Sequence, residues 1–235
     1  MADLRVEQAG PGQLLSDERL VFAFAHDLRA YLRNIVTKVQ LVRNSAVRIL
    51  PEEEQSALAE AVAAATEING LLNAMLAYCE GDPGSGSVSL RLLLRGLWID
   101  LKGALAEAGA DLDISNDLDI PVPAGLKPVL KELLTNACKF RSEARPLRIA
   151  VLTSMRAPSE IDLIVSDNGI GVEPEFLEKI FVPFQRLHSR DRFPGFGLGL
   201  ATCRRIVTAW GGSIVAEAGP ESRQGLTIRI SLPSN

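Results

Sequence analysis

The stretch between Ser16 and Pro51 constrains the fold of this chain most, because no proline or glycine interrupts it. Apolar residues recur along it at alternating steps of three and four, from Val21 to Ile49, which is the pattern of an amphipathic helix. Ser16 can cap such a helix, and the two acidic residues that follow it suit the first turn. We therefore expect one helix of about ten turns, which is long for a globular domain.

A second helix is expected directly after the first. The sequence "PEEE" at 51–54 combines a proline, which fits the first helical position, with acids that favour the helix dipole. An apolar side then continues from Leu58 to about Cys79. Two long helices joined by a short turn form an antiparallel hairpin, and one hairpin alone cannot bury both apolar sides. We expect two copies of the chain to pair into a four-helix bundle, which makes the protein a homodimer.

The glycine-rich stretch "GDPGSGS" at 81–87 has the composition of a linker on which a domain can move. After it, short strand patterns alternate with helical ones, and neighbouring strands look antiparallel, which indicates an α+β sandwich. The expected division is a leader at 1–15, a helical hairpin at 16–80, the linker, and the α+β domain at 88–235. The strands expected in this domain lie near 88–90, 112–115, 118–120, 147–155, 161–167, 213–218 and 226–232. The expected helices are one that ends near 108 and three that span about 124–140, 174–181 and 199–210.

The bulk composition excludes several classes of protein. The net charge is −4 and the pI is near 5.4, which argues against a nucleic-acid surface because such a surface needs a basic stripe. No window of about 18 residues lacks charge, and the N-terminus lacks the regions of a secretory signal. Cys79, Cys138 and Cys203 stand apart in the sequence, which predicts reduced thiols and no transition-metal site. We expect a cytoplasmic protein with no membrane insertion.

Three clusters in the second domain carry chemistry, and the first is "KELLTNACKF". It places Glu132, Asn136 and Lys139 at spacings of four and three, so that they share one face of a helix. A carboxylate, an amide oxygen and an ammonium on one side suit a hydrated Mg²⁺ ion with its phosphates. The alternative is an ordinary solvated helix face.

The second cluster follows an apolar strand in "IDLIVSDNGIGVEP". The strand ends in Asp167, and the chain then turns through Gly169 and Gly171, which permit positive φ and the close approach of a planar ligand. A carboxylate at the end of a buried strand can accept a hydrogen bond from an exocyclic amine such as that of adenine. The alternative is an ordinary Asn-Gly turn.

The third cluster, "GFGLGLA" at 195–201, runs straight into a helix. Gly195, Gly197 and Gly199 let successive backbone N–H groups face an anion, and the helix N-terminus adds its partial positive charge. The spacing is not that of a dinucleotide-binding fingerprint, and no strand precedes it. This signal is weak by itself.

In their order and spacing, the three clusters together resemble the nucleotide-binding domain of bacterial sensor histidine kinases, an ATPase fold shared more remotely with Hsp90, MutL and gyrase. The likeness covers about residues 88–232, and the segment "IFVPFQRLHSRDRFPGFGLGLATCRRIVTAWGG" is most similar to the kinase module of bacterial phytochrome-type histidine kinases. The resemblance implies that ATP and Mg²⁺ bind here. By this resemblance Asn136 is the Mg²⁺ ligand, Asp167 binds adenine, Glu132 assists phosphoryl transfer and the three glycines of the third cluster bind phosphate. Lys139 and the lid residues Arg186, His188 and Arg190 are expected to touch the phosphates.

His26, one of two histidines in the chain, is the remaining candidate. At about 100° per residue it lies about 160° from both Phe24 and Leu28, so it faces away from the apolar stripe. A lone histidine there is most simply a surface residue without a task. However, "HDLRAYLRN" resembles the phospho-acceptor box of the kinases' two-helix dimerisation domain, which makes His26 the phosphoryl acceptor and Asp27 the group that orients its ring. Tyr31 stands where that family usually has proline, so the helix is expected to continue without a break.

The sequence thus predicts a two-component histidine kinase that phosphorylates His26 and passes the phosphoryl group to an aspartate in the receiver domain of a response regulator. Its input signal would come from a removed sensor domain or from a separate sensor protein. Two alternatives remain open. One is a histidine phosphotransfer or scaffold protein with a vestigial ATPase-like domain, against which the intact Asn136, Asp167 and glycines argue. The other is an ATPase of the same fold that acts on serine or on conformation, which would need no histidine-bearing hairpin.

Overall fold

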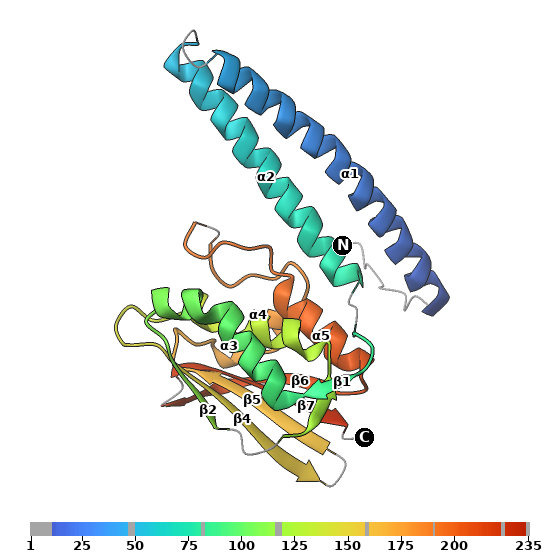
Figure 1. The fold of residues 1–235 in the computed structure, drawn as a ribbon, viewed down its shortest axis with the longest axis vertical. Coiled ribbons are helices and arrows are strands. Elements are labelled where there is room, and N and C mark those ends of the chain that lie inside the picture. Colours follow the sequence, from blue (N-terminus) through green and yellow to red (C-terminus); the bar gives the residue numbers. More distant parts are fainter. Residues whose placement is uncertain are drawn as a thin grey trace, which may run out of the picture. The chain divides into compact units, whose positions relative to one another are not determined.

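The computed structural model describes residues 11–46, 50–80, 83–115, 119–157, 160–189, 191–221 and 224–233. The chain divides into two compact units, Met1–Glu80 and Gly81–Asn235. The first unit is the helical hairpin and the second is the α+β domain (Figure 1). The elements in order are α1 Pro11–Ala46, α2 Glu52–Glu80, β1 Ser87–Ser89, α3 Leu90–Glu107, β2 Asp111–Ser115, β3 Pro121–Pro123, α4 Leu126–Lys139, β4 Arg148–Ala157, β5 Glu160–Asp167, two 3-10 turns at Pro174–Phe176 and Lys179–Phe181, α5 Gly199–Ala209, β6 Ser213–Glu221 and β7 Gln224–Pro233.

Helix α1 of the hairpin is unbroken over 36 residues. It begins at Pro11, so the expected start at Ser16 is wrong, since proline suits the first helical position and the residues after it continue the helix. The expected continuity through Tyr31 is confirmed. The apolar stripe divides into two rows, because Leu28 packs with α2 whereas Tyr31, Ile35 and Val42 are 68%, 51% and 48% exposed within one chain.

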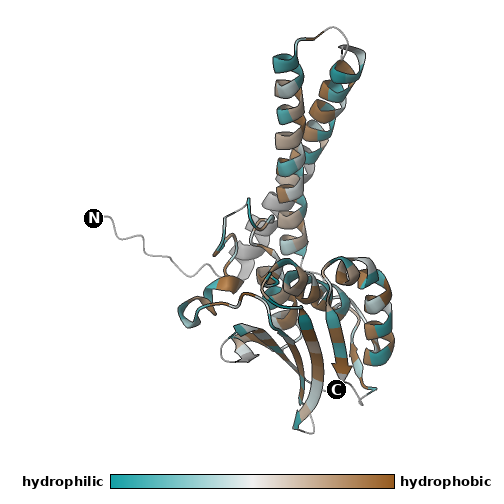
Figure 2. Ribbon diagram, turned by 90° about the vertical axis from the view of Figure 1, so that its left-hand side faces the viewer, coloured by the Kyte–Doolittle hydropathy of each residue, from teal (hydrophilic) through white to brown (hydrophobic). Residues whose placement is uncertain are grey.

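The second unit is built on a five-stranded sheet in the order β2-β4-β5-β7-β6. All its neighbouring pairs are antiparallel, as expected, except β2 and β4, which are parallel. Helices α3, α4 and α5 lie on one face of this sheet (Figure 1). Hydrophilic and hydrophobic residues alternate along the strands (Figure 2), as expected for a sheet buried on one face. The core between the layers includes Leu97, Leu130, Leu163 and Ile230, and the α+β sandwich expected from the sequence is confirmed.

One expected strand position needs correction. A strand was expected near 118–120, of which residue 118 lies outside the described residues, but the structure has β3 at Pro121–Pro123. It pairs with β1 in a separate two-stranded ribbon. The shift follows from Asp119, which accepts a hydrogen bond from the hydroxyl of Ser89 at 2.5 Å and so pairs with the N-cap of α3 before the strand begins.

Most of the expected linker at 81–87 belongs to the second unit, and its role as a hinge stays a prediction. The indole Nε1 of Trp210 donates to the carbonyl of Pro83 at 2.8 Å. A Cβ atom on Gly125 would lie 2.3 Å from that same carbonyl oxygen, so only glycine fits beneath it. The strand β1 then starts at Ser87. Residues 81–82 lie outside the described residues.

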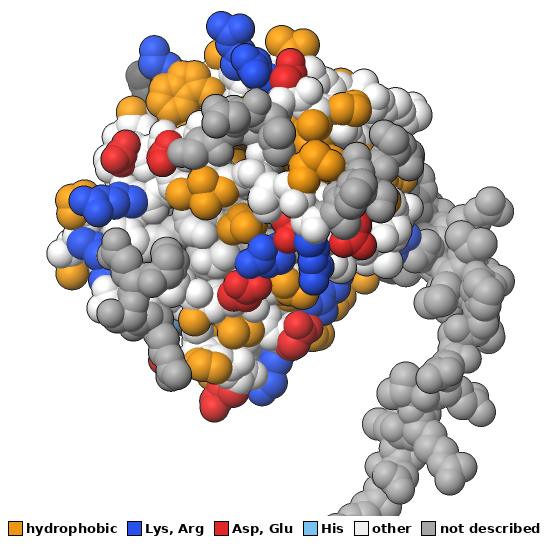
Figure 3. Space-filling view, turned by 90° about the horizontal axis from the view of Figure 1, so that it is seen from below, with side chains coloured by type: hydrophobic (Ala, Val, Ile, Leu, Met, Phe, Trp, Pro, Cys, Tyr) orange, Lys and Arg blue, Asp and Glu red, His pale blue; other side chains and the backbone are white. Residues whose placement is uncertain are grey.

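The surface shows mixed charge and the three cysteines form no disulfide with one another. On the face shown in Figure 3, Lys and Arg side chains are interspersed with Asp and Glu side chains. Cys79 is half-buried, whereas Cys138 and Cys203 are buried. Burial raises the pKa of Cys138 and of Cys203, so both thiols stay protonated at neutral pH. Among the described residues, no helix is long and apolar enough to cross a membrane.

Candidate functional site

Helix α4 carries three of the candidate residues at the spacing the sequence predicted. The carboxylate Oε1 of Glu132 accepts a hydrogen bond from Nδ2 of Asn136 at 3.0 Å. Each of the two residues is partly buried, and so is Lys139, one turn further along the helix. The opposite face of α4, which includes Leu133 and Leu134, is buried in the core. The expected division of this helix into an apolar and a polar face is therefore confirmed.

Helix α5 begins where Glu132 of α4 lies. A Cβ atom on Gly199 would be 1.8 Å from Oε1 of Glu132, so the carboxylate occupies the space that any other residue at the first position of α5 would fill. The N-cap residue Leu198 makes no side-chain capping bond. The negative charge at this helix N-terminus is favourable. Gly199 thus has a use that the sequence did not reveal, since it brings α5 close to the carboxylate of α4.

Asn136 also decides whether the site fits a magnesium ion. The bond to Glu132 uses the Nδ2 end of the amide, and the Oδ1 end is the oxygen type that Mg²⁺ prefers. Among the described residues, no three His, Cys, Asp or Glu side chains gather into a metal-binding group. The donor set therefore fits an ion that takes one or two protein oxygens and completes its shell with water and phosphate, as Mg²⁺ does.

Lys139 lies in an environment that disfavours its own charge. Burial lowers the pKa of Lys139, the nearby carboxylate of Glu132 raises it in part, and the like charge of Arg186 lowers it further. Its Nζ lies 4.7 Å from the centroid of the Phe140 ring and 3.1 Å from the place of a Cβ atom on Gly195. The carboxylate of Glu132 offsets only part of the burial, so an additional anion near Lys139 would stabilise its charged form.

Asp167 is the last residue of β5, a central strand of the sheet, and it pairs with Ile149 on one side and Leu226 on the other. Burial raises the pKa of Asp167, while the backbone N–H groups of Gly169 and Leu226 and the charge of Arg145 lower it in part. The N–H of Gly169 donates to Oδ1 of Asp167 at 2.8 Å. The backbone therefore orients this carboxylate, and the N–H groups and the charge of Arg145 offset only part of the effect of burial on its pKa.

The turn after Asp167 uses its two glycines for different reasons. Gly171 has a φ of +77°, as expected for a glycine turn. Gly169 instead permits a close approach, since a Cβ atom there would lie 2.4 Å from the carbonyl oxygen of Phe140. The next residue, Ile170, donates its N–H to that same carbonyl at 2.9 Å. The turn is thereby fixed to the end of α4.

The lid between the second 3-10 turn and α5 is held by aromatic rings. The Phe140 ring lies 4.8 Å from Phe193 and 6.0 Å from His188, measured between centroids, and Phe193 is buried. Arg186 donates from Nη2 to the carbonyl of Phe193 at 2.8 Å. Gly197, with a φ of +73°, accepts a hydrogen bond from the N–H of Phe184 at 2.9 Å. Sequence reasoning missed this role for Phe140 and Phe193, since isolated aromatic residues carry no periodic signal.

Two groups of expected site residues are placed differently. The structure brings Glu132, Asn136, Lys139, the Asp167 turn and the three glycines of residues 195–199 into one unit, through the contacts given above. The side chains of His26 and Asp27 lie outside the described residues, although both positions belong to α1. Arg190 also lies outside the described residues. Their roles stay predictions.

Comparison with known proteins agrees with this geometry. Residues 122–235 match the family described as "Histidine kinase-, DNA gyrase B-, and HSP90-like ATPase". Cyanobacterial phytochrome A from Nostoc sp. is 32% identical over 222 residues, which cover 92% of this chain and 28% of that protein. The chain spans less than a third of the length of the curated phytochrome relatives it matches.

Solved structures share the fold over nearly the whole chain. Full-length ShkA in complex with AMPPNP has a TM-score of 0.66 at 23% identity, and the match covers 97% of this chain and 47% of that one. Histidine kinase ThkA in complex with the response regulator protein TrrA has a TM-score of 0.60 at 19% identity, covering 95% of this chain and 64% of that one. At these identities the likeness concerns the fold, a helical hairpin followed by the ATPase sandwich.

The raised pKa of Asp167 predicts how stability depends on pH. A carboxyl whose pKa is higher in the folded than in the unfolded protein stabilises the fold below the ordinary value of 3.8, and this contribution is lost as the pH rises through the raised pKa. Asp167→Asn keeps an acceptor for the N–H of Gly169 and carries no charge. We expect the ligand-free variant to be at least as stable as the wild type at pH 7.5, with a difference in melting temperature that shrinks as the pH falls toward 4.

The measurement is the melting temperature of both proteins between pH 4 and 8, without nucleotide. Asp111→Asn, an exposed position on β2, is the matched control and is expected to show no such trend. A clear loss of stability in Asp167→Asn at pH 7.5, unchanged at lower pH, would contradict the prediction.

Proposed function

We propose that the chain carries the core of a sensor histidine kinase, a helical hairpin followed by an ATPase domain, and that it transfers the γ-phosphoryl group of ATP to its own His26. The observation that carries the proposal is the contact between α4, α5 and the Asp167 turn. Glu132, Asn136 and Lys139 share one helix face, the carboxylate of Glu132 abuts the first residue of α5, and α4 ends on the turn that follows Asp167.

The nucleotide is proposed to bind along this arrangement. Asp167 accepts a hydrogen bond from the exocyclic amine of adenine. The turn that follows Asp167 contains Gly169 and Gly171, so it is compact and lets the base approach. Lys139 and the backbone of the Gly195–Gly199 segment face the phosphates, and the N-terminus of α5 adds partial positive charge. Asn136 would hold Mg²⁺, which when bound neutralises charge on the phosphates.

The phosphoryl group is proposed to pass to an unprotonated ring nitrogen of His26. The bond between the γ-phosphorus and its bridging oxygen breaks, a phosphorus–nitrogen bond forms, and ADP leaves. Asp27 accepts a hydrogen bond from the other ring nitrogen, which fixes the tautomer and stabilises the positive charge that develops on the ring. Glu132 assists the transfer, and the backbone amides near Gly195 stabilise charge on the phosphates.

A response regulator is the proposed acceptor of the phosphoryl group from His26. An aspartate of its receiver domain would take the group, and the structural neighbour ThkA, whose structure contains the response regulator protein TrrA, supports this partner. A separate sensor protein remains the proposed source of the signal if no sensor domain is joined to the chain. The cytoplasmic location expected from the sequence stays a prediction.

Pairing of two copies through the hairpin is part of the proposal. Tyr31, Ile35 and Val42 follow one another at spacings of four and seven, so they share one face of α1. All three are exposed within the single chain, and Ile68 on α2 is 46% exposed. A row of this kind is what a second hairpin would cover in a four-helix bundle.

The decisive experiment is incubation with ATP labelled at the γ-phosphate. Wild-type protein is expected to become labelled, and the label should be lost in acid and kept in alkali, as for phosphohistidine. His26→Gln is expected to remain unlabelled while still gaining thermal stability from ATP and Mg²⁺, because its nucleotide site is intact. Asn136→Ala is expected to lose both the label and most of the Mg²⁺-dependent stabilisation.

Each alternative predicts a different result. No stabilisation of the wild type by ATP and Mg²⁺ would favour a scaffold with a vestigial ATPase-like domain. Label that survives in acid, or that persists in His26→Gln, would favour an ATPase that acts on serine. Either result would overturn the proposal.

The contact between Gly199 and Glu132 yields a second prediction. In Gly199→Ala the new methyl group would meet the end of the Glu132 side chain, which is flexible enough to rotate away, so the protein should fold. We expect ATP-dependent stabilisation to persist, while the initial rate of labelling falls by about 100-fold, the usual scale for losing a group that assists proton or charge transfer. Gly103→Ala, which meets nothing within 4 Å on α3, is the control and should label at the wild-type rate. Equal rates in both variants would remove Glu132 from the mechanism.

The exposed row on α1 yields a third prediction. Ile35→Glu places a charge in the middle of the proposed interface and is expected to convert the dimer to a monomer at micromolar concentration. Asn44→Glu, nine positions on and so on the opposite side of the same helix, should leave the dimer intact. Sedimentation velocity measures both. A monomeric wild type would overturn the dimer, and a dimeric Ile35→Glu would place the interface elsewhere.

A further inference from the structure

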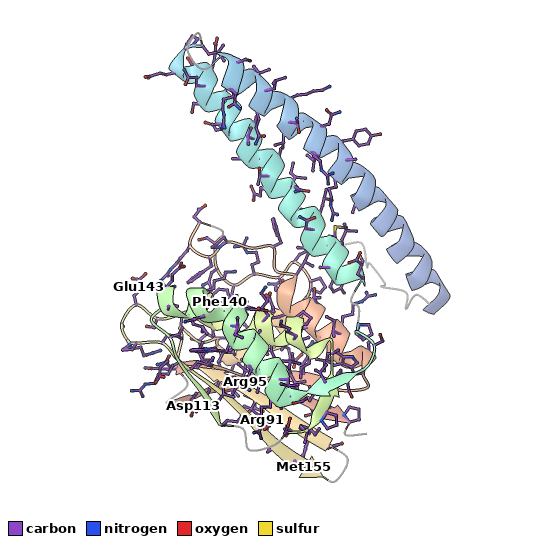
Figure 4. The ribbon with its side chains drawn as sticks, in the orientation of Figure 1. Arg91, Arg95, Asp113, Phe140, Glu143 and Met155 are labelled. Carbon is purple, nitrogen blue, oxygen red and sulfur yellow. The ribbon has the colours of Figure 1, made fainter. Side chains whose placement is uncertain are left out.

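Arg145 lies in the connection between α4 and β4 and binds the turn that follows Asp167. Figure 4 labels Phe140 and Glu143, which precede it in this connection. Its Nε donates to the carbonyl of Asn168 at 2.7 Å, and its Nη2 donates to the carbonyl of Gly169 at 2.7 Å. These carbonyls belong to the two residues directly after Asp167, so a single planar guanidinium fixes both residues.

A third bond ties the same side chain to the start of β7. The Nη1 of Arg145 donates to the side-chain oxygen of Gln224. The next residue, Gly225, has a φ of +85°, and a Cβ atom on it would lie 1.9 Å from the carbonyl oxygen of Asp167. The backbone of β7 therefore presses on Asp167 at the same place where Arg145 holds the following residues.

The charge of Arg145 acts on Asp167 in addition to these bonds. Burial raises the pKa of that carboxyl, and Arg145 is the charged side chain that opposes the shift. On α4, burial raises the pKa of the Cys138 thiol, the charge of Arg141 lowers it in part and the charge of Asp167 raises it, so this thiol stays neutral. The other groups that oppose the shift are the N–H groups of Gly169 and Leu226. The charge of Arg145 thus adds to the larger effect of these two N–H groups in favouring the ionised form of Asp167.

We infer that Arg145 is a positioning residue for recognition of the nucleotide base. It holds the Asp167–Gly169 turn in one geometry, and its charge favours the ionised carboxylate. It thereby sets the preference for adenine, which offers an amine at the position where guanine offers a carbonyl oxygen. The inference rests on the proposed function, because it assumes that Asp167 receives the base. A lysine could supply the charge but not the paired bonds to consecutive carbonyls. The effect of the charge of Arg145 can therefore be measured separately from the effect of its hydrogen bonds.

The test measures dissociation constants for ATP and GTP by calorimetry between pH 5 and 8.5. The proteins are the wild type, Arg145→Lys, Arg145→Met and the control Arg95→Met, an exposed arginine on α3 (Figure 4). We expect Arg145→Met to weaken ATP binding by about tenfold or more, the scale of losing bonds to a charged group. The loss should be smaller for GTP. The pH below which ATP affinity falls should move upward in Arg145→Met but stay at the wild-type value in Arg145→Lys, which keeps the charge.

The outcomes separate this inference from the proposed function. If the wild type binds no ATP, the proposed function fails. If it binds ATP and both Arg145 variants match it in affinity and pH profile, only the inference fails. Equal losses for ATP and GTP without a shift in the pH profile would show that Arg145 supports the fold alone, which also overturns the inference. Should Arg145→Met not fold, Arg145→Lys decides, since unchanged affinity for ATP and unchanged preference over GTP in that variant would overturn it.

Discussion

The carbonyl group of Phe140 joins the two halves of the proposed nucleotide site, and the relative placement of α4 and the Asp167 turn depends on this junction. It accepts a hydrogen bond from Ile170 at 2.9 Å and leaves room only for glycine at position 169. The helix that carries Glu132, Asn136 and Lys139 is thereby fixed to the strand that ends in Asp167. Without this junction, the two sets of polar side chains would sit on elements free to shift against each other, and a ligand that touches both would have to order them itself.

A second junction connects α4 to α5, and it depends on the absence of a side chain at Gly199. Because Gly199 has no side chain, the carboxylate of Glu132 lies against the first residue of α5 while it accepts a bond from Asn136. The packing is therefore not a by-product of a flexible loop. It places a negative charge at a helix N-terminus, which favours both the charge and the helix, and it holds the one carboxylate on this face of α4 in a single place.

The sequence predicted those parts of the molecule that repeat or alternate. The polar face of α4 and the strand leading to Asp167 followed from spacing, and the structure has both elements where they were expected. Arg145 could not be found this way, because its three bonds reach residues 23, 24 and 79 positions away and a connection has no periodicity. The apolar stripe of α1 was predicted as one surface, yet Leu28 packs with α2 whereas Ile35 stays exposed. Periodicity identifies an apolar face but does not say which neighbour covers which part of it.

The two charged groups nearest the proposed ligand are both held in unfavourable environments, and this restricts what can bind. Burial raises the pKa of Asp167 and lowers the pKa of Lys139, so folding disfavours the ionised form of each. A hydrogen-bond donor at Asp167 and an anion at Lys139 would reverse both shifts. A simple phosphate would satisfy only the lysine, and a free base only the aspartate. A molecule that joins an amine-bearing base to a phosphate chain would satisfy both, which is the class of ligand proposed for this site.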